Sequence, residues 1–281
     1  MPTLADVVAV LDRRYPPEAA AEWDAVGPVA GDPATQVTTV LLAVDPVEVV
    51  IDEAVNRGAQ LLVTHHPLYL RGTSTVYGGT AKGRLVQRLV TAGCGLYVAH
   101  TNADDVPGGV SDVLAEVCGV ADAVPLVPSE VLPGCGSGRV GELRAPTNLG
   151  AFAARVAEAL PATAVGLRVA GDLDRPVERV AVCGGAGDQF LDQAAAAGAD
   201  VYVTADLRHH YTSEHLARGG PALVDPGHWA TEWPWLVRAA AELTAAFLDP
   251  GTTDGEGTVV VHVSQVVTDP WTAHVTRREQ H

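Results

Sequence analysis

The chain has 281 residues, of which 47% are hydrophobic and 19% charged, so it is long enough for two globular domains and too apolar for a disordered protein. Its formal net charge of −16 disfavours sequence-independent binding of nucleic acid, because a negative surface repels phosphate backbones. No segment approaches the roughly 18 consecutive apolar residues that a bilayer requires, and the N-terminus lacks the pattern of a signal peptide. We therefore expect a cytoplasmic protein without a membrane partner.

The first expected element is a helix that begins after Thr3, because Thr3 and Asp6 have the spacing of a capping box and Val7 and Leu11 follow at helical spacing. Apolar runs typical of buried parallel strands follow in chain order at Val37–Val44, Leu61–Val63, Leu96–Ala99, Arg179–Val182, Val201–Val203 and Ala222–Val224. Most of these runs are separated by helix-length segments, and this alternation predicts an α/β fold. A last strand at Thr258–Val263 is expected to pair with a sheet already formed.

Part of the sequence occurs in two similar copies. The stretch EAVNRGAQLLVTHH, which ends at His66, resembles QAAAAGADVYVTAD, which ends at Asp206, and the segments that follow each of them also correspond. In both copies a glycine, Gly58 or Gly198, is placed to end a helix as a left-handed cap. The repeat predicts two similar α/β units that arose by an internal pseudo-duplication.

The best internal boundary is the segment Pro125–Gly141, which contains three prolines and the glycine-rich run GCGSGRVG and therefore has the composition of a linker or loop. We expect residues 1–125 together with 226–281 to form the first α/β domain. Residues 126–225 are expected to form the second.

Two adjacent histidines, His65 and His66, end the apolar strand of LLVTHHPLYL, and Pro67 stops the pairing of that strand. Open α/β sheets bind their ligands at the carboxyl ends of their strands, which is where this pair falls. Neighbouring residues of a strand point to opposite faces, so both imidazoles serve one site only if the chain turns there. The alternative is one core histidine and one surface histidine.

Further polar side chains follow two other strands. His100 and Asp104 come after LYVAH in the first copy, where Asp104 alone is also compatible with a helix cap or a loop acid. His228 and Glu232 come after PALVD in the second copy, and their i, i+4 spacing presents both side chains on one face if a helix begins there. An isolated H-x-x-x-E pattern is a weak signal.

Taken together, His65, His66, Asp104, His228 and Glu232 indicate a metal site, because imidazole and carboxylate donors suit Zn, Fe, Mn, Co or Ni. Five donors are more than one open catalytic metal takes from protein, which favours two divalent ions per chain that share Glu232. The four cysteines lie far apart without a CxxC pair and are interpreted as core thiols.

The motifs THHP, HTNAD and GHWATE, together with EWDAVG and the central run VAVCGGAGDQFLDQAAAAGADVYVTADLRHH, resemble the Nif-three-like dinuclear-metal family, whose members are often named GTP cyclohydrolase 1 type 2 homologues. The similarity runs from Trp23 to the TDPW at Thr268–Trp271. It implies a Nif-three-like fold, metal ligands at the five positions named above, and a toroidal homohexamer. Ala25 and Pro28 depart from the residues that are more usual in the EWDAVG loop.

Three more histidines are candidates for hydrogen bonding to ligands or for contact with substrate. They are His100, His209 and His210, the last two of which follow the second-copy strand that corresponds to the one ending at His65. The glycine-rich GGAGDQ at Gly184–Gln189 can bind an anion, although a plain strand-to-helix turn is the simpler interpretation.

The residues leave the activity open between three hypotheses. The first is a metal-dependent hydrolase acting on a nucleotide or another phosphate-containing small molecule, with catalytic residues unknown. The second is a metal carrier or insertion protein without turnover, which needs the same ligands. The third, a purely structural metal, is disfavoured because such sites are usually closed and tetrahedral. We also expect His65→Ala and His66→Ala each to remove a metal and to leave the fold largely intact.

Overall fold

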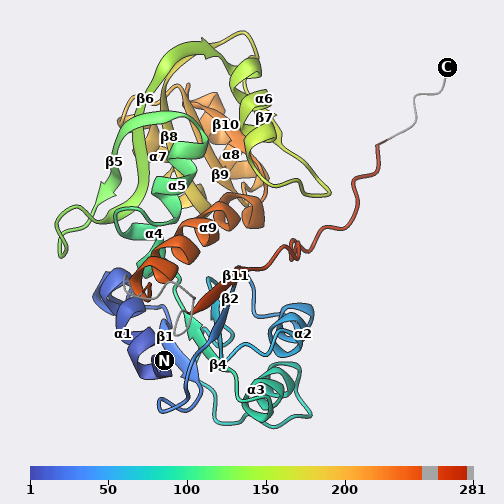
Figure 1. Ribbon diagram of the computed structural model, residues 1–281. Coiled ribbons are helices and arrows are strands. Elements are labelled where there is room, and N and C mark those ends of the chain that lie inside the picture. The colour runs from blue at the N-terminus through green and yellow to red at the C-terminus, as the bar shows by residue number, and fades with distance from the viewer. Residues whose placement is uncertain (249–258, 277–281) are drawn as a thin grey trace. The chain divides into compact units, whose positions relative to one another are not determined.

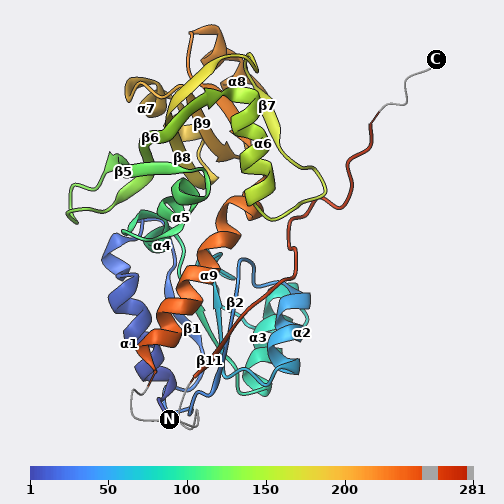
Figure 2. The same ribbon diagram turned by 45° about the horizontal axis from the view of Figure 1, so that its top comes forward.

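The computed structural model describes residues 1–248 and 259–276 and has a mixed α/β architecture with two sheets (Figures 1 and 2). Contacts divide the chain into two compact units, Met1–Gly109 with Trp235–Thr268, and Val110–Pro234 with Asp269–His281. The divisions fall after residues 109, 234 and 268, whereas the sequence placed them after 125 and 225. Among the described residues, no helix is both long enough and apolar enough to cross a membrane.

The first unit contains a five-stranded sheet in the order β1-β4-β3-β2-β11. Its strands are β1 (Gly27–Ala30), β2 (Thr39–Ala43), β3 (Leu61–Thr64), β4 (Gly95–Val98) and β11 (Val260–Val263). Its helices are α1 (Leu4–Arg14), the 3-10 turn η1 (Pro17–Ala19), α2 (Glu48–Asn56), α3 (Ala81–Thr91), α4 (Thr101–Asp105) and the later part of α9 (His228–Ala246). All neighbouring strands of this sheet are parallel except β1, which runs antiparallel to β4 at one edge.

Alternation along the strands builds the core of the first unit. Leu41, Leu62 and Leu96 point to one face of the sheet and pack against α2 and α3. On the other face lie α1 and the later part of α9 (Figure 2). These two helices are joined by an ion pair between Arg14 and Glu242. Parallel strands covered on both faces read as continuous apolar runs, which is why the sequence predicted β2, β3 and β4.

The second unit contains a six-stranded sheet in the order β5-β6-β8-β9-β10-β7. Its strands are β5 (Val120–Pro128), β6 (Gly136–Asn148), β7 (Arg168–Ala170), β8 (Pro176–Ala186), β9 (Val201–Ala205) and β10 (Ala222–Asp225). Its helices are α5 (Val110–Val117), α6 (Leu149–Ala159), the 3-10 turn η2 (Asp188–Phe190), α7 (Leu191–Ala196), α8 (His209–Ala217) and the first turns of α9. α5 and α6 pack on one face of the sheet, and α7 packs on the other.

The predicted duplication is confirmed by the topology. In the first unit β2-α2-β3-α3-β4 forms three parallel strands, and β1 lies antiparallel beyond β4. In the second unit β8-α7-β9-α8-β10 forms three parallel strands, and β7 lies antiparallel beyond β10. Gly58 and Gly198 both adopt positive φ, as their predicted capping role requires.

The prediction of a linker or loop at Pro125–Gly141 holds only for the middle of the segment, because β5 and β6 fill its two ends and pair with each other in antiparallel fashion. Pro125 and Pro128 are compatible with β5 because this strand lies at the edge of the sheet, where a missing N–H is tolerated. The predicted last strand is confirmed over Val260–Val263, where β11 pairs with β2, while Thr258 lies outside the described residues.

The predicted start of the first helix is also confirmed. The Thr3 hydroxyl accepts a hydrogen bond from the backbone N–H of Asp6, and the Asp6 carboxylate accepts one from the backbone N–H of Thr3, which completes the capping box.

Candidate metal centre

The paired histidines come directly after β3. The backbone N–H groups of His65 and His66 still donate to the carbonyls of Ala43 and Val44, so the pairing with the β2 side of the sheet continues through both residues. His65 is fully buried and His66 is half-buried, and their ring centroids lie 5.0 Å apart. Both imidazoles therefore lie at one place at the carboxyl end of the sheet, as a turn in the chain allows.

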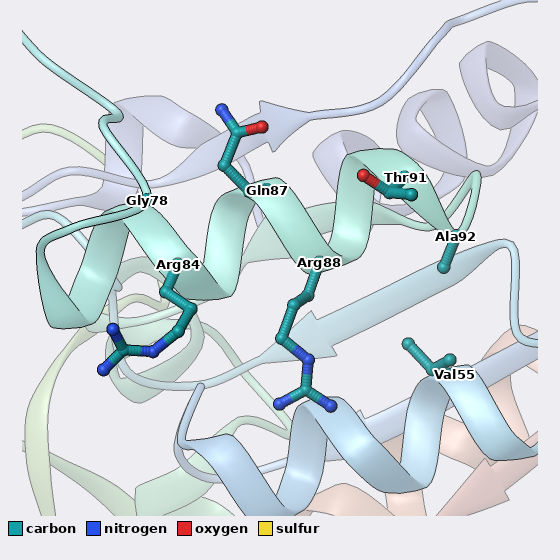
Figure 3. A pocket seen from close by; sticks show the side chains of 7 residues that line it. All are labelled: Val55, Gly78, Arg84, Gln87, Arg88, Thr91 and Ala92. Carbon is teal, nitrogen blue, oxygen red and sulfur yellow. The ribbon is translucent and has the colours of Figure 1, made fainter.

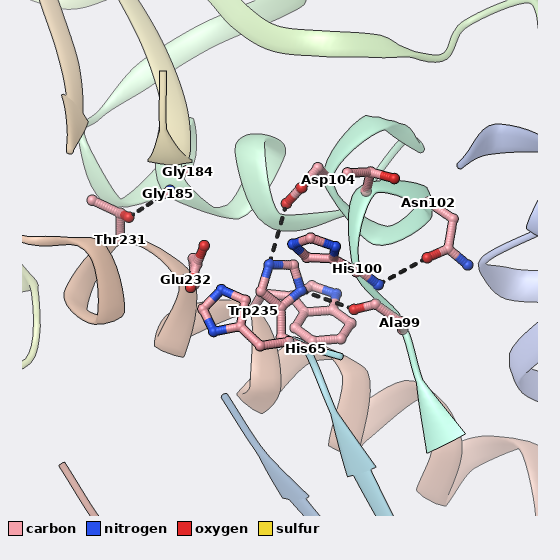
Figure 4. Close-up of polar contacts among 12 residues, drawn as sticks. His65, Ala99, His100, Asn102, Asp104, Gly184, Gly185, Thr231, Glu232 and Trp235 are labelled. Carbon is pink, nitrogen blue, oxygen red and sulfur yellow. Dashed lines mark hydrogen bonds and ion pairs between the residues drawn. The ribbon is translucent and has the colours of Figure 1, made fainter. Parts of the chain in front are cut away.

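His100 and Asp104 are brought to the same place by β4 and α4. The His100 ring centroid lies 5.2 Å from that of His65 and 5.5 Å from that of His66, and one ring nitrogen of each of the three lies within 4.8 Å of the others. Asp104 Oδ1 lies 3.5 Å from His65 Nε2 (Figure 4). The first unit thus gathers three imidazoles and a carboxylate at the carboxyl end of its sheet.

Each of these imidazoles is held by a hydrogen bond at Nδ1. His65 Nδ1 lies 2.8 Å from the Ala99 carbonyl oxygen, and because a carbonyl only accepts, the proton is on Nδ1 and the lone pair of the neutral ring is on Nε2. His66 Nδ1 lies 2.7 Å from Asp45 Oδ1, and His100 Nδ1 lies 2.8 Å from Asp24 Oδ1. Histidines that bind metals through Nε2 are oriented in this way.

Asp24 connects the EWDAVG loop to the site through His100. Its fully buried carboxylate accepts hydrogen bonds from the Thr101 N–H and hydroxyl at 3.0 and 2.5 Å, as well as from His100. Burial raises the pKa of Asp24, but the bonds from His100 and Thr101 outweigh burial and hold the pKa below its ordinary value. Asp24 therefore stays ionised and fixes both the His100 ring and the start of α4.

The second unit contributes another pair of candidate donors, His228 and Glu232. His228 begins α9, and the predicted presentation of His228 and Glu232 on one helix face is confirmed by a distance of 2.9 Å between His228 Nε2 and Glu232 Oε1. Glu232 is only 3% exposed. His228 Nδ1 lies 2.8 Å from Asp206 Oδ2, so this imidazole also has a carboxylate behind it. Asp206 occupies the position in the second copy that His66 occupies in the first.

Electrostatics at this pair favour a proton when no metal is bound. Burial lowers the pKa of His228, but the carboxylates of Glu232 and Asp206 outweigh it and raise the pKa to about 11. A divalent ion bound at His228 Nε2 would have to displace that proton.

The glycine-rich turn at the end of β8 has a steric role beside the pair. Gly185 has a φ of +63°, and a Cβ placed on it lies 2.4 Å from Glu232 Oε1 and 3.1 Å from His228 Nε2. Its N–H donates to the Thr231 hydroxyl at 2.9 Å (Figure 4). The glycine thus leaves room for the carboxylate and imidazole of α9.

We predict that Gly185→Ala weakens metal binding at His228 and Glu232 by roughly tenfold, the lower end of what disturbed ligand surroundings cost. Gly198→Ala is the matched control, because Gly198 has a similar φ of +71° and nothing within 4 Å of the added Cβ. Both variants carry the backbone strain of about 1 kcal/mol. Competition titration with a chelator measures the affinities, and equal affinities in the two variants would contradict the steric role.

His209 and His210 do not join a donor cluster in the part of the chain that the structure describes. Both are exposed in the first turn of α8, and their rings contact each other at a centroid distance of 5.2 Å. Their role as hydrogen-bond partners or substrate contacts stays a prediction.

Two cavities lie near α3. One, of about 460 Å³, is lined by residues of α2, α3 and Gly78 and includes none of the histidine donors (Figure 3). Arg88 in its wall is paired with Glu48 and Asp52, so its charge is already compensated. The second, of about 330 Å³, is lined by Pro46 and Pro67, the residues that follow Asp45 and His66, and by the cationic Lys82 and Arg84 among others.

The chain resembles known proteins both in sequence and in fold. The family model described as Duf34/NIF3 (NGG1p interacting factor 3) matches residues 2–270. A relative from Streptomyces coelicolor, named GTP cyclohydrolase 1 type 2 homolog, is 53% identical over 98% of this chain and 95% of its own length. A relative of the same name from Mycobacterium bovis is 36% identical over 386 aligned positions, more than this chain contains, so it carries residues that are absent here.

Solved structures agree with the sequence comparison. A Staphylococcus aureus hypothetical protein has a TM-score of 0.86 and 26% identity over 98% of this chain and 100% of its own. A Bacillus cereus protein related to NIF3 has a TM-score of 0.85 and 25% identity over 96% and 99% of the two chains. The resemblance that the THHP and GHWATE motifs suggested is thus confirmed over nearly the whole sequence, and the chain belongs to the Duf34/NIF3 family.

Proposed function

We propose that this protein holds a dinuclear divalent-metal centre and is a metal-dependent hydrolase. The proposed donors are His65, His66 and Asp104 from the first unit, with His228 and Glu232 from the second. The observation that carries the proposal is the hydrogen bond that each histidine makes through Nδ1 to a backbone carbonyl or a carboxylate. That arrangement leaves Nε2 as the coordinating atom in every case.

The chemistry of the donor set fits such ions. Imidazole and carboxylate donors suit Zn, Fe, Mn, Co or Ni. The four cysteines are buried, as the sequence predicted, and burial raises the pKa of Cys94 and Cys118 to about 12, so these two thiols stay protonated. Cys94 and Cys118 are therefore not suited to act as thiolate ligands.

When bound, divalent ions supply Lewis acidity and lower the pKa of water for attack on an electrophilic centre. The residues of this chain orient the ligands and keep space for them. Asp45 and Asp206 hold the protons on Nδ1 of His66 and His228, which keeps both rings in one tautomer and one orientation. Gly185 keeps the space at Glu232 open on the side of β8.

The substrate class that we propose is a nucleotide or another small molecule that carries a phosphate. The relatives are named for GTP cyclohydrolase 1 type 2, which makes GTP one member of that class. The cavity of about 330 Å³ beside Pro46 and Pro67 supports an anionic ligand, because the exposed cations Lys82 and Arg84 line it, whereas the one carboxylate in its wall, Glu48, is paired with Arg88.

Burial favours a resident metal over a transported one. His65 is fully buried and Glu232 is 3% exposed, so their donor atoms are fixed by packing and not by the ion alone. A carrier that binds and releases its ion is better served by mobile, exposed donors. We therefore place the hydrolase ahead of the carrier.

The ring of six copies stays a prediction from the family resemblance.

The test is metal analysis of the purified protein, followed by a turnover screen over nucleotides and phosphate esters. We expect two ions per chain, loss of metal in His66→Ala, and no loss in His274→Ala, which changes an exposed histidine. Hydrolysis of at least one phosphate-containing compound should require the metal. Saturation at one ion per chain would refute the dinuclear centre, and full occupancy with no turnover on any compound would favour the carrier.

A further inference from the structure

The carboxylate behind His66 is held from two sides. Asp45 Oδ1 accepts the hydrogen bond from His66 Nδ1 at 2.7 Å, and Asp45 Oδ2 accepts a short hydrogen bond from the Thr268 hydroxyl. Asp45 lies two residues after the end of β2, whereas Thr268 is 223 residues later in the chain, in the TDPW motif. One side chain of this late segment is therefore in contact with the residue that orients a proposed metal ligand.

The path of the chain explains why Thr268 reaches Asp45. β11 runs parallel to β2 with Val263 opposite Leu42, so the segment that leaves β11 continues in the same direction, past the carboxyl end of β2. Two contacts anchor it on the way. The Ser264 hydroxyl donates to Glu53 of α2 at 2.6 Å, and Val266 packs against the core that α2 and α3 share.

We propose that Thr268 is a positioning residue for the metal centre, acting through Asp45 on His66. This inference rests on the proposed metal-binding function and assigns a role to the TDPW motif, which contributes none of the proposed ligands. The function of β11 is then to carry the hydroxyl to the site as well as to complete the edge of the sheet.

The physical basis is the number of bonds that fix the carboxylate plane. With one bond to His66 alone, the Asp45 carboxylate can rotate about its last torsion, and His66 Nδ1 can exchange its partner for water. With Oδ2 bound to Thr268, both oxygens are fixed, so Nδ1 keeps its proton and Nε2 keeps its direction. The backbone of His66 is held as well, because the Thr64 hydroxyl donates to the His66 carbonyl at 2.9 Å.

The experiment compares Thr268→Val, which keeps the shape but removes the hydroxyl, with Thr268→Ser, which restores it. Zn²⁺ affinity is measured by chelator competition in the full chain. We expect Thr268→Val to weaken one of the two ions by roughly tenfold, as is typical of lost partners behind a ligand, and Thr268→Ser to recover most of that loss. Thr272→Val changes an exposed threonine of the same segment and should match the wild type.

A double-mutant cycle separates action through Asp45 from a general structural role. In an Asp45→Ala background, Thr268→Val should change the Zn²⁺ affinity by less than about twofold, because the residue it acts through is gone. A tenfold loss in that background, or none in the wild-type background, would overturn the proposal.

A readout without metal keeps this inference distinct from the proposed function. Long-range ¹H–¹⁵N correlation spectra of the metal-free protein report which ring nitrogen of His66 carries the proton. The wild type should show the proton on Nδ1, and Thr268→Val should show a mixture that Thr268→Ser reverses. A wild type that binds no Zn²⁺ but shows these spectra would refute the metal centre and leave the positioning role standing. Identical spectra for all three proteins would refute the positioning role.

Discussion

His65→Ala is expected to lose metal from the first unit and to destabilise the fold by about 3 kcal/mol, because the substitution leaves a cavity and an unsatisfied carbonyl in the core. The imidazole is fully buried, and its ring centroid lies 5.5 Å from that of Trp235. Its Nδ1 also satisfies the Ala99 carbonyl. The sequence alone predicted that this change leaves the fold largely intact, whereas the burial of His65 leads us to expect a measurable loss of stability.

His66→Ala is the matched comparison. The His66 side chain is 22% exposed, and Asp45 keeps its bond from Thr268 when the imidazole is removed. We expect metal loss with a free-energy change of about 1 kcal/mol or less, which is typical of partly exposed positions. Denaturant unfolding of both metal-free variants, together with metal analysis, measures the contrast. Equal stability of the two variants would show that the packing around His65 contributes nothing.

The strands that carry the site could be predicted because they are buried on both faces. β2, β3, β4, β8, β9 and β10 read as continuous apolar runs, and the polar residues that follow them were visible as breaks in those runs. The strands that were missed are edge or antiparallel strands. β1 and β7 are short strands at the sheet edges, and β5 contains prolines that resemble a linker until its place at the edge is known.

The candidate metal donors could be picked out of the sequence for the same reason, whereas the residues that hydrogen-bond to them could not. Asp24 and Asp206 each lie more than 20 residues from the histidine that they hold, and isolated aspartates are common in loops. Only the fold brings those pairs together. Asp45 is different, because it comes at the end of the apolar run LLAVD, just as His66 comes at the end of LLVTHH. The rule that ligands bind at the carboxyl ends of strands therefore pointed to Asp45 as well as to the histidines.

Glu232→Gln should weaken metal binding on the order of a hundredfold and, if the protein is the proposed hydrolase, abolish turnover even with metal in excess, because the charge that would balance the ions is lost while the shape is kept. The amide is neutral, so the main carboxylate that raises the pKa of His228 is also removed. In the wild type, metal displaces a proton from a group with a pKa of about 11, so the apparent affinity should rise with pH up to that value. In Glu232→Gln the rise should end at a lower pH.

Asp104→Asn is the comparison variant, because Asp104 belongs to the donors of the first unit, 3.5 Å from His65 Nε2. If Glu232 is shared by both ions, Glu232→Gln weakens the two together, whereas Asp104→Asn weakens mainly one. Metal content, affinity between pH 6 and 9, and turnover of both variants side by side decide the matter. We propose that the two ions share Glu232, the buried carboxylate beside His228. Normal occupancy of both sites in Glu232→Gln would therefore refute a cluster shared by the donors of the two units.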